Sequence, residues 1–175
     1  ALGRVDVAQA HRWRCFEHRL SVDHFRAYLK ELPDFEDVEA EDCARAHILG
    51  HGNVLEALHF CLTWPDLHTA SDLVTVRAGE LDGDHYALLS SAADALRDRH
   101  PLAATLLWRA MNDFARNESR GSRYGYAARH LTDCGAVSAE IASLESYAPN
   151  DAYVATLKDK HMRITSVLES VGKST

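Results

Sequence analysis

Four prolines divide the chain into segments of similar length, and this spacing limits the folds that are open to it. Pro33, Pro65, Pro101 and Pro149 lie 32, 36 and 48 residues apart. Proline cannot continue a helix, and it disfavours the helical conformation of the residue before it, so each proline is compatible with a helix boundary. An interval of this length holds about one helical hairpin, which is the period expected of helical repeats.

The segments between the prolines carry apolar residues at helical spacing. From Ser21 onward, Val22, Phe25, Leu29 and Leu32 follow one another at intervals of 3, 4 and 3 residues, which matches a period near 3.6. No segment of the sequence shows sustained alternation with β-branched residues. We predict helices over residues 5–20, 21–32, 38–48, 53–64, 67–79, 86–96, 101–114 and 124–135, a short helix around Ile141 and Leu144, and a long helix from Asn150 onward.

Residues suited to helix ends flank several of these segments. Ser21 is expected to cap the second helix, and Asn53 with Glu56 three residues later is typical of a cap for the fourth. Pro101 suits the first position of a helix, where its missing N–H costs nothing. Gly135 is the expected C-terminal stop of the eighth helix.

The expected fold is all-α, with about ten helices in antiparallel hairpins that stack as an α-solenoid resembling tetratricopeptide repeats. A compact helical bundle is the alternative. We expect residues 1–171 to form a single helical-repeat domain cut from a longer chain, and residues 172–175 to form a frayed tail.

Composition and charge exclude several classes of protein. No apolar run approaches the ~18–20 residues that a membrane-spanning helix needs, so no membrane partner is expected. The four cysteines are widely spaced and form no CxxC pair. This pattern argues against a disulfide framework and fits a reducing, cytoplasmic location. The net charge of −7 makes nucleic acid an unlikely partner.

The charge is unevenly distributed along the chain. Seven acidic residues and no basic residue lie between Glu31 and Asp42, whereas seven arginines lie between Arg97 and Arg129. The arginine-rich segment 97–129 indicates either a solvated helix face or a basic recognition surface for an acidic peptide or a nucleic-acid backbone. The candidate ligand-binding residues are Trp108, Arg109, Asn112, Arg116, Arg120, Arg123, Tyr124 and Arg129.

These observations favour a protein- or peptide-binding scaffold module without catalytic residues or cofactor. Its partner would be an unidentified protein or an acidic peptide that binds the concave face of the solenoid. The alternatives are a metal-dependent or hydrolytic enzyme that uses a His/Cys cluster, or nucleic-acid binding through segment 97–129. The side chains available for a hydrolytic site assembled in space are Ser90, Ser91, His130 and Cys134.

Two groups of histidines have a spacing that a metal site can use. His47 and His51 are four residues apart, but no general-base glutamate lies between them. His11, Cys15 and His18 share one helix face, and a thiolate with two imidazoles suits zinc, although no fourth ligand is evident. We interpret both groups as ordinary surface or core residues in preference to metal ligands.

Five stretches of the sequence resemble a bacterial family known as domain of unknown function 6880. They are residues 12–17 (RWRCFE), 28–41 (YLKELPDFEDVEAE), 100–111 (HPLAATLLWRAM), 124–131 (YGYAARHL) and 153–161 (YVATLKDKH). The similarity covers nearly the whole chain and corresponds to the C-terminal helical region of longer family members. The resemblance implies tetratricopeptide-like helical repeats and implies no enzymatic activity.

Overall fold

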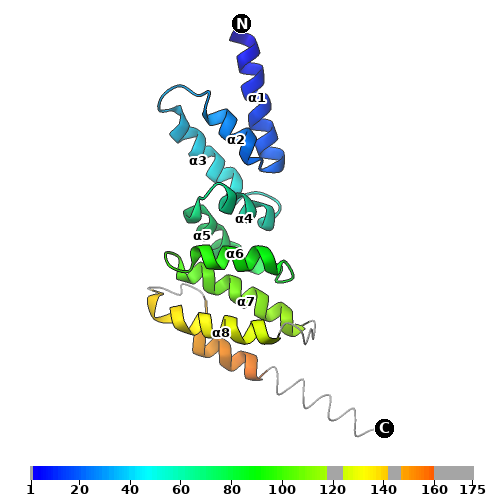
Figure 1. Ribbon diagram of the computed structural model, residues 1–175, viewed down its shortest axis with the longest axis vertical. Helices are drawn as coiled ribbons and strands as arrows, with labels where there is room; N and C mark the ends of the chain where they lie inside the picture. The colour runs from blue at the N-terminus through cyan, green and yellow to red at the C-terminus, as the bar shows by residue number, and fades with distance from the viewer. Residues whose placement is uncertain (1, 118–123, 142–146, 160–175) are drawn as a thin grey trace, which may run out of the picture.

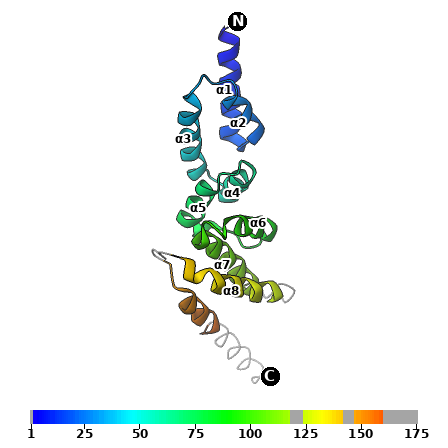
Figure 2. The same cartoon turned by 60° about the vertical axis from the view of Figure 1, so that its left-hand side comes forward.

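Successive helices of the computed structural model follow one another in chain order along its longest axis (Figure 1). The structure describes residues 2–117, 124–141 and 147–159. These three ranges contain nine α-helices and no strand, which confirms the all-α prediction. The same order of helices along the axis is visible after a turn of 60° (Figure 2).

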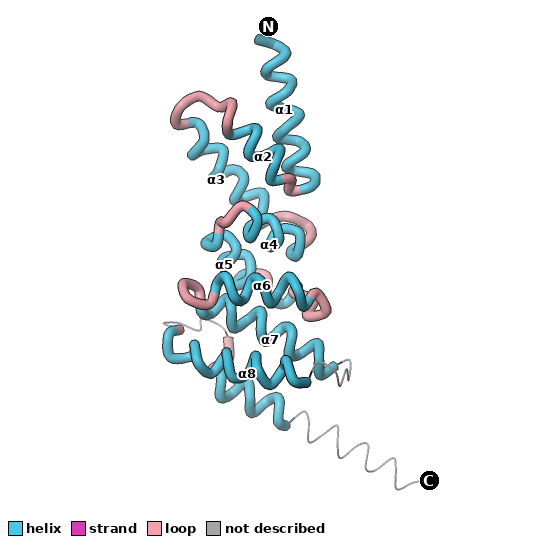
Figure 3. The backbone as a smooth tube through the Cα atoms, in the orientation of Figure 1, coloured by secondary structure: helices cyan, strands magenta, loops and turns pink. Residues whose placement is uncertain are grey.

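The helix bounds agree with most of the predicted segments, and loops join the helices at their ends (Figure 3). The helices are α1 (Leu2–Arg19), α2 (Val22–Leu29), α3 (Glu36–Leu49), α4 (Val54–Thr63), α5 (Leu67–Val76), α6 (Tyr86–Leu96), α7 (Pro101–Asn117), α8 (Tyr124–Val137) and a further helix over residues 150–159, with short 3-10 helices η1 (Ala78–Glu80) and η3 (Ser138–Glu140).

The end of the second predicted helix is wrong by three residues. α2 ends at Leu29 and does not continue to Leu32. Backbone bonds from Leu32 N to Leu29 O and from Glu31 N to Tyr28 O turn the chain before it reaches Pro33. The helix therefore ends three residues before Leu32, the residue that Pro33 directly restricts.

Two predictions near the end of α8 also differ from the structure. Gly135 does not stop the helix but lies inside α8, which ends at Val137. Ile141 follows η3 in an extended conformation, so the short helix expected around it is not present at that residue. Leu144 and the tail over residues 172–175 lie outside the described residues.

Helices pack both on their neighbours in the chain and on every second helix. α1 packs on α2, α4 on α5, α6 on α7 and α7 on α8. In addition, α3 contacts α5, α5 contacts α7, and α4 contacts α6. These contacts arrange α3, α5 and α7 in one row and α4 and α6 in a second row beside it.

An aromatic cluster joins α1, α2 and α4. The rings of Phe16 and Phe25 stack with centroids 4.7 Å apart, and both contact Phe60 of α4. Trp13 and Trp64 pack against the same rings at 5.2 and 5.0 Å. Aromatic pairs of this kind contribute about 0.5–1.5 kcal/mol each beyond the area that they bury. Two of the three tryptophans therefore hold this end of the molecule together.

The two predicted N-terminal caps, Ser21 and Asn53, are confirmed. Ser21 Oγ accepts a hydrogen bond from the backbone N–H of His24, and Asn53 Oδ1 accepts one from that of Leu55. Asn53 Nδ2 also donates to Glu56 Oε1 at 3.0 Å, which holds the capping side chain against the first turn of α4. Caps of this kind stabilise a helix by about 1 kcal/mol.

The acidic run from Glu31 to Asp42 spans the α2–α3 loop and the first half of α3. Glu36, Asp37 and Glu39 lie in the first turn of α3, and all three are exposed. Negative charge there complements the positive end of the helix dipole. The run is therefore a solvated helix start.

Candidate functional site

An open groove lies along the row formed by α3, α5 and α7. Its volume is about 670 Å³, and its walls come from the end of α3, the second half of α5, the start of α7 and the residues around η3. Leu49, Val76, Leu102 and Ile141 give it an apolar lining. Val76 is 78% exposed, although it is a β-branched apolar residue at the end of a helix. Val76 therefore extends the apolar lining of the groove to the molecular surface, and a concave site with a mainly apolar lining is typical of ligand pockets.

Charged side chains border this groove. Arg77 is held in place from two directions: its Nη1 donates to the carbonyl oxygen of His51 at 2.6 Å, and its Nε donates to Glu80 Oε1 at 2.9 Å. Arg99, which is exposed, and His100 line the groove just before α7, and the acidic residues Asp72 and Glu140 also line it. Burial, with a contribution from nearby His68, lowers the pKa of His100, so this ring is neutral at physiological pH.

A residue distant in sequence fixes one side of the groove. The phenolic O–H of Tyr147 donates to the carbonyl oxygen of Thr75 at 2.6 Å, across 72 residues of sequence. Thr75 itself lines the groove. The contact ties the chain before the last helix to α5, so this wall is positioned by tertiary structure and not by local sequence.

The structure places three of the predicted binding residues in the interior. Trp108 is 2% exposed, Arg109 7% and Asn112 1%. Arg109 Nη1 donates to the carbonyl oxygen of Ala148 at 2.9 Å, and its guanidinium lies over the ring of Tyr153, 4.5 Å from the centroid. In this conformation, Arg109 fastens the helix over residues 150–159 to α7.

The remaining predicted binding residues lie at or beyond the end of α7. Arg129 on α8 is exposed and lies 4.0 Å from Asp133. Arg120 and Arg123 lie outside the described residues, as do the side chains of Arg116 and Tyr124. Trp108 and Arg129 border the same small pocket of about 80 Å³, whereas Arg109 borders a different one. The described members of the set therefore do not share one open face.

The side chains considered for a hydrolytic site do not form a catalytic arrangement. Ser90 and His130 border the same small pocket, but neither ring nitrogen of buried His130 has a hydrogen-bond partner in the described structure. Cys134 is fully buried, and this burial raises the pKa of its thiol to about 12. A thiol with such a pKa is protonated at neutral pH and is a poor nucleophile. Ser91 is exposed and does not border this pocket.

His47 and His51 lie close together, but each already bonds to the backbone. Their ring centroids are 5.9 Å apart. His47 Nε2 donates to the carbonyl oxygen of Glu17 at 2.9 Å, which joins α3 to α1, and His51 Nδ1 lies 3.2 Å from the carbonyl oxygen of Asn53. These contacts support the interpretation of His47 and His51 as ordinary structural residues in preference to metal ligands.

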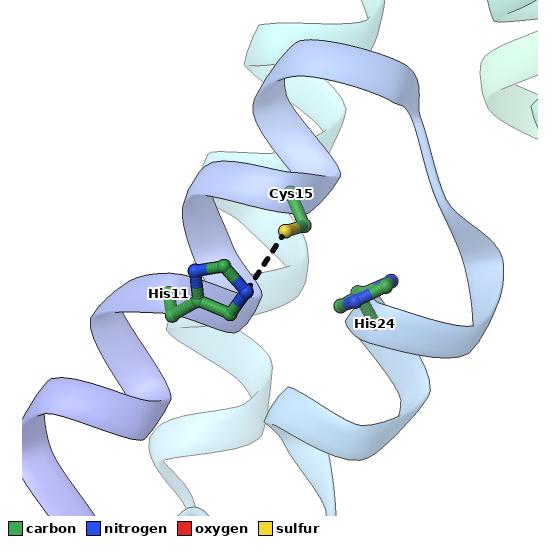
Figure 4. Close-up of side chains that lie close together, drawn as sticks. All are labelled: His11, Cys15 and His24. Atoms are coloured by element: carbon green, nitrogen blue, oxygen red, sulfur yellow. Dashed lines mark hydrogen bonds between the residues drawn. The ribbon is translucent and has the colours of Figure 1, made fainter.

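The second histidine group is rearranged relative to the prediction. His11, Cys15 and His24 each offer a ligand atom, and these atoms all lie within 4.8 Å of one another (Figure 4). His18 borders the same pocket but is not part of this group. Spacing along one helix does not indicate His24, because this residue lies on α2 and not on α1. The available signal was the Ser21 cap, which places His24 in the first turn of a helix that folds back on α1.

The family model described as "Family of unknown function (DUF6880)" matches residues 1–169. No curated protein and no solved structure gives a significant match. Among the described helices, none is both long enough and apolar enough to cross a membrane.

Proposed function

The chain belongs to the DUF6880 family of unknown function, and we propose that it is a protein- or peptide-binding module built as a tetratricopeptide-like α-solenoid. Contacts between every second helix support this architecture, because stacked hairpins bury their apolar faces against the next repeat. The four cysteines are free, which supports a cytoplasmic location.

The observation that carries the proposal is the groove between α3, α5 and α7. A volume of about 670 Å³ accommodates several side chains of a peptide segment. Exposed Val76, together with Leu49 and Leu102, provides apolar contacts for such side chains. Exposed Arg99 provides a charge for an acidic group of the same segment, and Asp72 and Glu140 line other parts of the groove, so the proposed peptide has apolar anchors and an acidic group at the Arg99 end.

A second contact surface is proposed at the arginine-rich end of α7 and the start of α8. Arg116, Arg120, Arg123, Tyr124 and Arg129 are the residues proposed to contact the partner. Trp108, Arg109 and Asn112 would support this surface from the buried side of α7. Arg129 supports the proposal because it is exposed on α8 and available to an acidic partner.

Selection of peptides followed by groove substitutions tests the proposal. Peptides selected from a random library on the wild-type chain should lose more than tenfold in affinity for Val76→Asp, because a carboxylate in the apolar wall must be desolvated on binding. Val7→Asp is the matched control, since Val7 is also an exposed valine (68%) and lies on α1, away from the groove. If both variants bind the selected peptides as the wild type does, the groove is not the binding site.

A further inference from the structure

Helix α1 places one histidine and one cysteine on the same face. His11 and Cys15 are four residues apart, which brings their side chains together on adjacent turns. Cys15 Sγ lies 3.5 Å from His11 Nε2 (Figure 4). In a tetrahedral zinc site, with Zn–N of about 2.0 Å and Zn–S of about 2.3 Å, neighbouring ligand atoms are about 3.3–3.8 Å apart. This pair therefore already has the separation of two zinc ligands.

The tight turn between α1 and α2 adds the third side chain. Leu20 adopts a positive φ of 44°, and its buried side chain holds the turn against the core. Ser21 then caps α2, so that His24 stands in the first turn of α2 and faces α1. The rings of His11 and His24 have centroids 6.4 Å apart. Two helices, and not one as the sequence spacing indicated, thus contribute to the group.

We propose that His11, Cys15 and His24 form a zinc-binding site at the first hairpin. The three ligand atoms lie within 4.8 Å of one another, so rotations of surface side chains suffice to close them around one ion. This site is separate from the groove between α3, α5 and α7, and the proposal is independent of peptide binding.

The chemistry of the donors favours zinc over the harder cations. The group consists of two imidazoles and one thiolate, with no carboxylate among its three members. Magnesium and calcium require oxygen ligands, whereas zinc accepts nitrogen and sulfur. Ser21 Oγ lies 2.8 Å from His24 Nδ1, which leaves Nε2 of that ring for the metal. Such a bond to the other nitrogen of a ligating histidine orients the ring.

The surroundings leave one coordination position open. The three ligands border a surface pocket of about 730 Å³, which Arg14, His18 and Arg19 also line. Three protein ligands with a fourth position for water are the arrangement of open zinc sites such as catalytic ones, whereas closed structural sites have four protein ligands. The bound ion would join α1 to α2 and stabilise the first hairpin.

Cobalt titration of the full chain tests this site. Chain without an affinity tag, reduced and freed of metal with a chelator, is titrated with Co²⁺ and then with Zn²⁺. We expect about one ion per chain, with a thiolate-to-cobalt charge-transfer band and visible bands of tetrahedral intensity that zinc abolishes. Zinc should also raise the midpoint of thermal unfolding.

Matched variants identify the ligands. Cys15→Ser should abolish the charge-transfer band, and His24→Ala should weaken metal binding more than tenfold. Cys43→Ser and His18→Ala should bind as the wild type does, because Cys43 is exposed on α3 and His18 lies outside the group. Circular dichroism verifies that each variant is folded. Absence of cobalt binding by the wild type, a band that persists in Cys15→Ser, or a loss of binding in His18→Ala but not in His24→Ala would overturn the proposal.

Discussion

Gly83 lies directly against the backbone of Ala110. A Cβ atom built at Gly83 would lie 2.3 Å from the carbonyl oxygen of Ala110 and 2.5 Å from the Cβ of Phe114. No described glycine has a positive φ, so the requirement for glycine comes from this close approach and not from the backbone conformation. The turn before α6 is therefore docked on α7, and it positions these two helices relative to each other.

Replacement of this glycine should destabilise the fold. In Gly83→Ala the added methyl group overlaps backbone atoms that cannot move aside without a shift of α7. Overpacking of this kind costs about 1–3 kcal/mol. In a chain of this size, each kcal/mol lowers the melting temperature by about 2–4 °C. Urea unfolding followed by circular dichroism measures the loss.

Gly79→Ala is the control for this substitution. No heavy atom lies within 4 Å of a Cβ at Gly79, so its stability should stay within about 0.5 kcal/mol of the wild type. Equal effects of the two substitutions would contradict the close approach of Gly83 to α7.

Removal of the Arg109 side chain should release the last described helix. Arg109→Ala loses the hydrogen bond to Ala148 and the contact with the Tyr153 ring. A buried cation–π contact and a charge-assisted hydrogen bond together contribute about 2–4 kcal/mol. Hydrogen exchange of residues 150–159 should become faster, while exchange of α4 and α5 stays unchanged. Exposed Arg99→Ala is the control, and protection of residues 150–159 that survives in Arg109→Ala would refute this role.

Local helical order could be predicted from the sequence because its causes are local. The spacing of apolar residues is a property of the helix itself. The capping residues Ser21 and Asn53 lie directly before the helices whose start they determine. Tertiary contacts are different. The packing of Gly83 on Ala110 depends on a helix 27 residues further along the chain.

The candidate sites were harder to predict for the same reason. Arg109 was expected at a binding surface because it lies in an arginine-rich segment. Its side chain is buried instead, next to Tyr153, which lies 44 residues further along the chain. His24 joins His11 and Cys15 only through the sharp turn at Leu20. Charge counts and helical spacing contain no information on such contacts between helices.

The four cysteines should fall into two classes of reactivity. Cys43 is exposed and Cys15 is half-buried, whereas Cys61 and Cys134 are fully buried, and burial raises the pKa of both buried thiols to about 12. Because the thiolate is the reactive form, dithiobis(nitrobenzoate) should label only Cys43 and Cys15 in the native chain. All four should react in denaturant. Fast labelling of four thiols in the folded chain would contradict the burial of Cys61 and Cys134.

His130 should make the fold sensitive to mild acid. Its ring is 4% exposed, and neither nitrogen has a hydrogen-bond partner in the part of the chain that the structure describes. Burial lowers its pKa from the ordinary value of 6.5, against the opposing effect of Asp133. Between this lowered pKa and 6.5, the unfolded chain binds more protons at this site than the folded chain does. The free energy of unfolding should therefore fall as the pH decreases, by up to about 1.4 kcal/mol per pH unit.

The substitution His130→Leu separates this effect from other titrations. Leucine fills a similar volume and removes both the proton-binding group and the two unpartnered nitrogens. We expect it to raise the free energy of unfolding at neutral pH by about 1 kcal/mol and to reduce the slope below pH 6.5. Part of the slope should remain, because burial also lowers the pKa of His100. Exposed His59→Leu is the control and should retain the wild-type pH dependence. Urea unfolding at a series of pH values measures all three chains, and a slope in His130→Leu as steep as in the wild type would show that another group causes the acid sensitivity.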